Sequence, residues 1–87
     1  MQLAKIIGKV WATKKADALE GQRFALAQMM NAAGQLSPQT LVACDTIGAG
    51  VGDTVLIAHG HAARLALGRD IPADCVVIAI IDSVERP

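Results

Sequence analysis

At 87 residues the chain is long enough for one domain, and we expect a single domain over residues 1–87. Hydrophobic residues make up 53% of the chain and charged residues 18%, against a usual charged share of about 25%. A domain of this size buries only roughly 60% of the surface that its unfolded chain exposes. More apolar side chains are therefore present than one small core can hide, which predicts association with a partner.

Charge, aromatic content and the length of the apolar runs argue against two classes of partner, nucleic acids and membranes. Eight basic and eight acidic residues give a net charge of zero, and one Trp, one Phe and no Tyr leave few rings for base stacking. Nucleic-acid-binding domains normally carry a basic patch and stacking aromatics. The longest apolar run, residues 75–81, is far shorter than the roughly 20 residues of a membrane helix. We therefore expect neither nucleic acid nor a membrane as partner.

The N-terminal residues do not read as a signal peptide, because Lys5 and Lys9 interrupt the apolar positions and no cleavage site follows. This favours a cytoplasmic protein. In that compartment Cys44 and Cys75 are expected to be reduced, buried thiols.

The first half of the chain reads as two strands and the start of a third. Residues 2–13 alternate apolar and polar positions with β-branched residues, which predicts a strand with a bend at Gly8. A polar stretch turns at Gly21, and residues 23–30 form the next candidate strand, although their Ala, Leu and Met residues suit a helix equally well. Turn chemistry over residues 31–38 predicts a hairpin connection.

The second half completes the third strand and adds a fourth strand, a short helix and a fifth strand. A third strand is predicted over residues 41–47 and a fourth over residues 54–58, with a glycine loop between them. Gly60 begins a short helix that Gly68 ends. Residues 75–84, apolar on both faces, form the last strand, which is central or covered by a partner.

These elements predict a mainly β fold: a five-stranded barrel of the oligonucleotide/oligosaccharide-binding (OB-like) type, with one short helix between the fourth and fifth strands. Closing the sheet into a barrel also removes exposed strand edges.

The glycine loop, residues 48–52, has three interpretations. A dinucleotide-binding loop needs a further Gly or Ala three residues after Gly50 and a helix behind it, whereas Asp53 and a strand follow here. The remaining interpretations are a simple turn between two strands, or a loop that packs against its own copies where only glycine lets backbones approach. Composition does not choose between these two.

Other polar residues offer weaker sites. His59 and His61, spaced two apart, suggest a metal pair, but Gly60 and the change to helix break their common face, and zinc needs three or four ligands. Arg64, among alanines on the short helix, can give a forked donor to a partner or remain a solvated charge. No nucleophile motif is present, so we expect no enzyme and no cofactor.

Residues 42–56, with the run Val42-Ala43-Cys44-Asp45-Thr46-Ile47-Gly48-Ala49-Gly50-Val51-Gly52, resemble the signature of the EutN/CcmL family of microcompartment vertex proteins. The likeness extends over nearly the whole chain. It is carried also by residues 1–10, Leu19-Glu20-Gly21-Gln22, Ala63-Arg64, Pro72-Ala73-Asp74 and Ile78-Ala79-Ile80-Ile81-Asp82.

The resemblance implies a structural shell protein: a homopentamer that caps the vertices of a polyhedral bacterial microcompartment, next to hexameric facet shell proteins. It also implies that the subunit interface or axial loop contains Asp45, Ile47, Gly48, Ala49, Gly50, Val51 and Gly52, with His61 and Arg64 as further contacts. The alternatives are an OB-type module that binds single-stranded nucleic acid or saccharide, and a small metal enzyme using His59 and His61.

Overall fold

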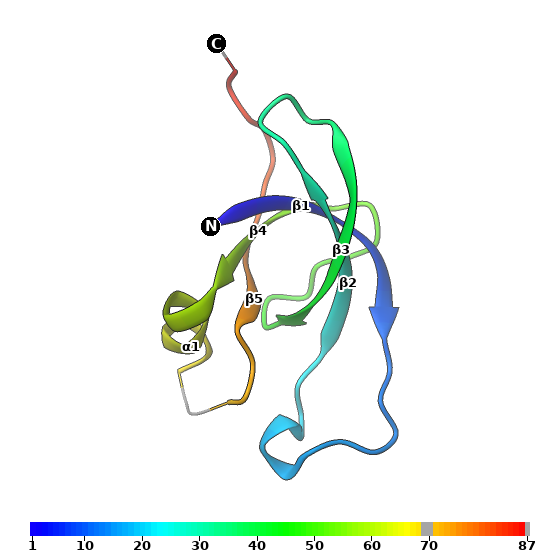
Figure 1. Cartoon of the computed structure of the whole chain (residues 1–87), viewed down its shortest axis with the longest axis vertical. Helices are drawn as coiled ribbons and strands as arrows, with labels where there is room; N and C mark the ends of the chain where they lie inside the picture. The colour runs from blue at the N-terminus through cyan, green and yellow to red at the C-terminus, as the bar shows by residue number, and fades with distance from the viewer. Residues whose placement is uncertain (69–70, 87) are drawn as a thin grey trace.

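The computed structural model describes residues 1–68 and 71–86. It confirms the predicted class: a closed barrel of five strands with one α-helix between the fourth and fifth (Figure 1). The elements are β1 (Gln2–Val10), a 3-10 helix η1 (Asp17–Leu19), β2 (Phe24–Met30), β3 (Leu36–Asp45), β4 (Thr54–His59), α1 (Gly60–Leu67) and β5 (Cys75–Ile80).

The strands follow one another around the barrel in the order β1-β2-β3-β5-β4. Neighbouring strands run antiparallel, except that β3 and β5 meet in parallel through two residue pairs, Cys44 with Val76 and Asp45 with Val77. The β2–β3 turn and the C-terminal segment lie at one end of the molecule, and the long connection from β1 through η1 to β2 lies at the other (Figure 1).

The barrel interior is filled largely by small side chains. Ala25 and Ala27 of β2 are almost fully buried with Ile6 and Ile57, while the residues between them on β2 face outward. A five-stranded barrel leaves little room inside, so alanine is the side chain that fits. This packing overrides the helix propensity of β2 and confirms the strand that the sequence left ambiguous.

A second cluster lies outside the barrel, beneath α1. Ala63, fully buried, packs with Ala58 of β4 and with Cys44 and Val76. Gly68 ends the helix as predicted: its φ of 72° is left-handed, and its amide donates to the carbonyls of Arg64 and Leu65.

Several predicted boundaries are wrong. The third strand starts at Leu36, not at residue 41, because the turn needs only the residues around Asn31, whose side-chain oxygen accepts the amides of Ala33 and Gln35. It ends at Asp45 and not at residue 47. Pro38 is tolerated inside β3 because it sits in an irregular stretch of the pairing with β2.

The first and last strands are shorter than predicted. β1 ends at Val10 rather than at residue 13, because Val10 is the last residue of β1 that pairs with β2. β5 ends at Ile80 rather than at residue 84; the amide of Ile81 still donates to Thr54 O at 2.8 Å, and no later residue that the structure describes pairs with β4. The length of each of these strands is set by how far its partner strand extends. The periodicity of one segment does not show where its partner ends.

Candidate functional site

The glycine loop is folded by the carboxylate that precedes it. Asp45, the last residue of β3, accepts the amides of Ile47 (3.1 Å) and Gly48 (3.0 Å) on Oδ1 and that of Ala49 (2.9 Å) on Oδ2. Asp45 is itself buried. One side chain therefore satisfies three consecutive backbone donors and fixes the first half of the loop.

The second half of the loop is held by Asp53 and by β1. Asp53 Oδ2 accepts the amide of Gly50 at 2.8 Å, and the amide of Asp53 donates back to Gly50 O at 3.0 Å. Gly52 donates to Ile6 O at 2.8 Å, and Ile6 donates to Asp53 O at 2.9 Å. The loop is thus fastened to β1 without any contact from outside the chain.

The three glycines of the loop have different reasons to be glycine. Gly48 and Gly52 have φ values of 82° and 97°, which side-chain-bearing residues rarely adopt. Gly50 has no such φ, and a Cβ built on it would meet only Asp53 Oδ2, at 3.6 Å, an ordinary contact. Nothing within the described chain therefore requires a glycine at position 50.

The loop presents an apolar outer surface. Ala49 points into the barrel and is buried, whereas Ile47 is 44% and Val51 64% exposed. Four of the five backbone amides of the loop, those of Gly48, Ala49, Gly50 and Gly52, already donate within the chain. This surface therefore offers shape and apolar contact rather than a cradle for an anion. The dinucleotide interpretation, rejected from the sequence, has no structural support either, because β4 and not a helix follows the loop.

A cleft of about 600 Å³ lies beside the loop, at the η1 end of the barrel. Its walls include Lys9, Trp11, Arg23, Asp45 and Gly48. Trp11 is 87% exposed. Because the sequence pattern placed Trp11 in a strand, its exposure was not predicted. Its position next to the polar stretch that follows was the indication that it lies at the surface.

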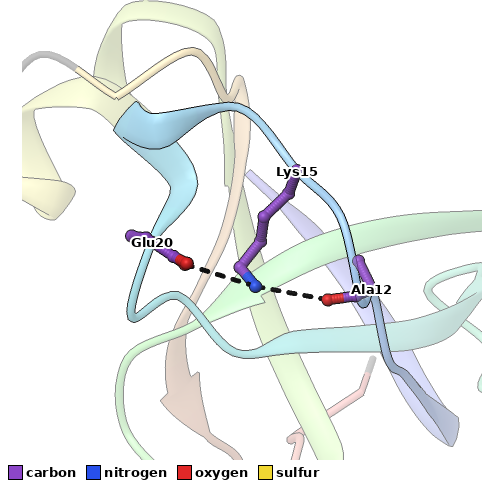
Figure 2. Close-up of polar contacts among 3 residues, drawn as sticks. All are labelled: Ala12, Lys15 and Glu20. Atoms are coloured by element: carbon purple, nitrogen blue, oxygen red, sulfur yellow. Dashed lines mark hydrogen bonds and ion pairs between the residues drawn. The ribbon is translucent and has the colours of Figure 1, made fainter.

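Lys15 lines part of the cleft wall. Its Nζ donates to Ala12 O at 3.2 Å and pairs with the Glu20 carboxylate at 3.3 Å (Figure 2). Glu20 is exposed, so this ion pair contributes little stability. It links the two halves of the β1–β2 connection.

The two helix residues predicted for the site lie elsewhere. His61 and Arg64 are exposed on α1, which packs on β4 and β5, whereas the glycine loop is bonded to β1. The seven predicted residues from Asp45 to Gly52 therefore form one unit, while His61 and Arg64 lie on a different element, α1, whose Ala63 packs with Cys44 at the end of β3. Leu65, 68% exposed on the same helix, is a further apolar surface residue that the sequence analysis did not single out.

His59 and His61 do not form a common site. His59 closes β4 with its Nδ1 3.3 Å from Cys75 Sγ, and its Nε2 is buried without a hydrogen-bond partner, while His61 is exposed. In the residues that the structure describes, no three His, Cys, Asp or Glu side chains are grouped so as to hold a metal ion.

Both cysteines are free, Cys44 buried and Cys75 half-buried rather than fully buried as expected. Burial raises the pKa of the Cys44 thiol. It also raises the pKa of the Cys75 thiol, helped by the neighbouring carboxylate of Asp74. The two groups are therefore neutral thiols rather than reactive thiolates.

Comparison with known proteins identifies the chain. The family model described as "Ethanolamine utilisation protein EutN/carboxysome" matches residues 1–82. The chain belongs to the EutN/CcmL family. This confirms the resemblance on which the sequence analysis relied.

Members of the EutN/CcmL family match over almost the full chain. The "Carboxysome shell vertex protein CcmL" of Thermosynechococcus vestitus is 42% identical over 87 residues, which cover 99% of this chain and 88% of that protein. The solved structure of Gloeobacter violaceus CcmL superposes with a TM-score of 0.94 at 41% identity, covering 99% of this chain and 90% of that one.

A third relative is described as pentameric. The "GrpN pentameric microcompartment shell protein from Rhodospirillum rubrum" superposes with a TM-score of 0.92 at 32% identity, covering 100% of both chains.

The part of the chain that the structure describes has no helix of the length and apolarity needed to cross a membrane.

Proposed function

We propose that this chain is a structural subunit of a bacterial microcompartment shell, within the cytoplasm, and that five copies form a ring that caps a vertex of the shell. The relatives described as vertex proteins and the pentameric GrpN support this function. The contacts of the chain with hexameric facet proteins are part of the same proposal, as is the absence of catalytic activity.

The observation that carries the proposal for the interface is Gly50. The described chain contains no steric or conformational reason for a glycine there, while Ile47 and Val51 on either side expose apolar surface. Packing of a neighbouring subunit against the loop supplies that reason.

The distribution of the proposed interface residues fits a ring. In a closed ring each subunit uses two different surfaces, one for each neighbour. The glycine loop lies beside β1, and the exposed face of α1, with His61, Arg64 and Leu65, lies outside β4 and β5. We assign these two surfaces to opposite sides of one repeated contact.

Native mass spectrometry tests the assembly directly. The expected species contains five chains of 9.0 kDa each. A stable monomer at micromolar concentration contradicts the proposal. A ring of six keeps a shell role but removes the vertex, because six-fold units tile flat layers.

Gly50→Val tests the loop as an interface. We expect the variant to lose the pentamer while its subunit keeps the wild-type circular dichroism, since an added Cβ meets only Asp53 Oδ2 within the described chain, at 3.6 Å. Gly50→Ala, the matched smaller substitution, should weaken assembly less. An intact Gly50→Val pentamer of wild-type stability would show that the loop is only a turn.

A further inference from the structure

One edge of β3 is open along most of its length. β3 pairs with β2 on one side from Leu36 to Cys44, but on the other side it meets β5 only at Cys44 and Asp45. Residues 36–43 therefore have no strand beside them on that side within the described chain. In Figure 1 the β2–β3 hairpin extends away from β5 toward one end of the molecule.

The direction of the backbone groups on this edge follows from the register. The amide of Asp45 donates to Arg23 O at 2.8 Å, so Asp45 faces β2, and the alternation of an antiparallel ladder makes Ala43 and Leu41 face β2 as well. The N–H and C=O groups of Thr40 and Val42 then point to the open edge. Outside the strand ladders, no backbone hydrogen bond of the described residues involves these groups.

The irregular stretch before Thr40 is completed locally. Gln28 Nε2 donates to Ser37 O at 2.9 Å, and the amide of Gln39 donates to Ser37 Oγ at 3.1 Å. Side chains of the same hairpin thus bond the backbone groups of Ser37 and Gln39 in this irregular stretch. Thr40 and Val42 remain as the residues of the edge that can bond another strand.

The sequence of the hairpin also lacks the charges that protect strand edges; the charged side chain that is bonded to it, Arg86, donates to Ala32 O in the turn. From Phe24 to Cys44, 21 consecutive residues include no Asp, Glu, Lys, Arg or His, so all 16 acidic and basic residues of the chain lie outside the hairpin. Solvent-exposed edges normally carry lysine or other charges that prevent pairing with another chain. Here Val42 is 48% and Leu36 47% exposed instead. This is the composition of a covered surface, since interface cores are depleted of charge.

We infer that the open edge of β3 pairs, backbone to backbone, with a neighbouring copy of this chain. The inference rests on the proposed ring and adds a second contact to the glycine loop. Another copy is the occupant because the chain is proposed to self-associate and because an uncharged edge with four outward backbone groups is a template for pairing with another strand. The hydrogen bonds of Thr40 and Val42 would set the register between subunits.

Hydrogen–deuterium exchange on the intact assembly tests this without any substitution. In the pentamer, the amides of Thr40 and Val42 should exchange at least about tenfold more slowly than that of Thr13, which lies in the connection after β1. Exchange of both amides as fast as that of Thr13, in a sample that native mass spectrometry shows to be pentameric, overturns the inference and leaves the proposed function standing. Absence of any oligomer overturns both.

A pair of variants removes the bond itself. Thr40→Pro deletes the outward N–H and should shift the pentamer toward monomers with retained circular dichroism, whereas Thr40→Ala keeps the N–H and should remain pentameric. A fully pentameric Thr40→Pro overturns the inference. If Thr40→Pro does not fold, the exchange rates of the wild-type protein decide. Protection of Thr40 and Val42 that appears only after a hexameric shell protein is added also overturns it.

Discussion

The glycine loop and the β2–β3 hairpin both present exposed apolar side chains, yet their backbones differ. In the loop, four consecutive amides, those of Ile47, Gly48, Ala49 and Gly50, are accepted by two carboxylates of the same chain. On the open edge of β3, the amides and carbonyls of Thr40 and Val42 have no partner in the described structure.

This difference teaches what each region can contribute to an assembly. A loop with four consecutive amides held by its own carboxylates is folded before any partner arrives, so it offers a fixed shape for apolar packing. A strand edge offers directional bonds that only another backbone, or water, can complete. The loop suits close approach between subunits, and the edge suits a defined register between them.

The comparison depends first on Asp45. Asp45→Ala should lower the free energy of unfolding of the subunit by about 3 kcal/mol, because three amides, one of them buried, lose a charged acceptor. Chemical denaturation of wild type and variant measures the change. Asp82→Ala, an exposed carboxylate beyond β5, is the control and should leave stability unchanged. An Asp45→Ala subunit as stable as wild type would show that the loop is not held from within.

A second test separates conformation from contact inside the loop. Gly52→Ala places a side chain at a φ of 97° and should destabilise the subunit by about 1–2 kcal/mol. Gly50→Ala, at an ordinary φ, should change subunit stability by less than about 0.5 kcal/mol. Thermal unfolding of the two variants measures both. Equal losses at the two positions would remove the distinction between them, and with it the argument that Gly50 serves a neighbour.

The smallest effect concerns the thiols at the base of the hairpin, where β3 meets β5. Burial raises the pKa of Cys44 and of Cys75 above the ordinary value of 9.0. A thiol whose pKa is higher in the folded state stabilises the fold fully below its unfolded pKa, and this contribution is lost as the pH rises through the folded value. The free energy of unfolding should therefore decline above pH 9.0.

The decline is measured by urea denaturation at a series of alkaline pH values. The double variant Cys44→Ala/Cys75→Ala is the control and should show a flatter pH dependence, whatever its absolute stability. Identical slopes for wild type and control would mean that the thiols do not stabilise the junction of β3 and β5.

Much of the fold was predictable because its signals are local. Alternation, apolar runs and turn residues together located all five strands, and Gly60 and Gly68 bounded the helix that the structure confirms. The start of β3 was missed because Pro38 reads as a turn residue, and only the pairing with β2 shows that the strand passes through it. Of the predicted site, the run from Asp45 to Gly52 is one structural unit, but Asp53, which holds Gly50, was not among the predicted site residues.

The sequence alone determined the class of fold, the family and the place of the glycine loop, because periodicity, turn residues and an ordered motif are properties of neighbouring positions. The tertiary structure decided which alanines fill the barrel, which glycine has no reason within the chain, and which edge of β3 is open. Those features depend on where distant strands meet: two residue pairs between β3 and β5 close the barrel, and the rest of β3 is left without a partner on that side in the described chain.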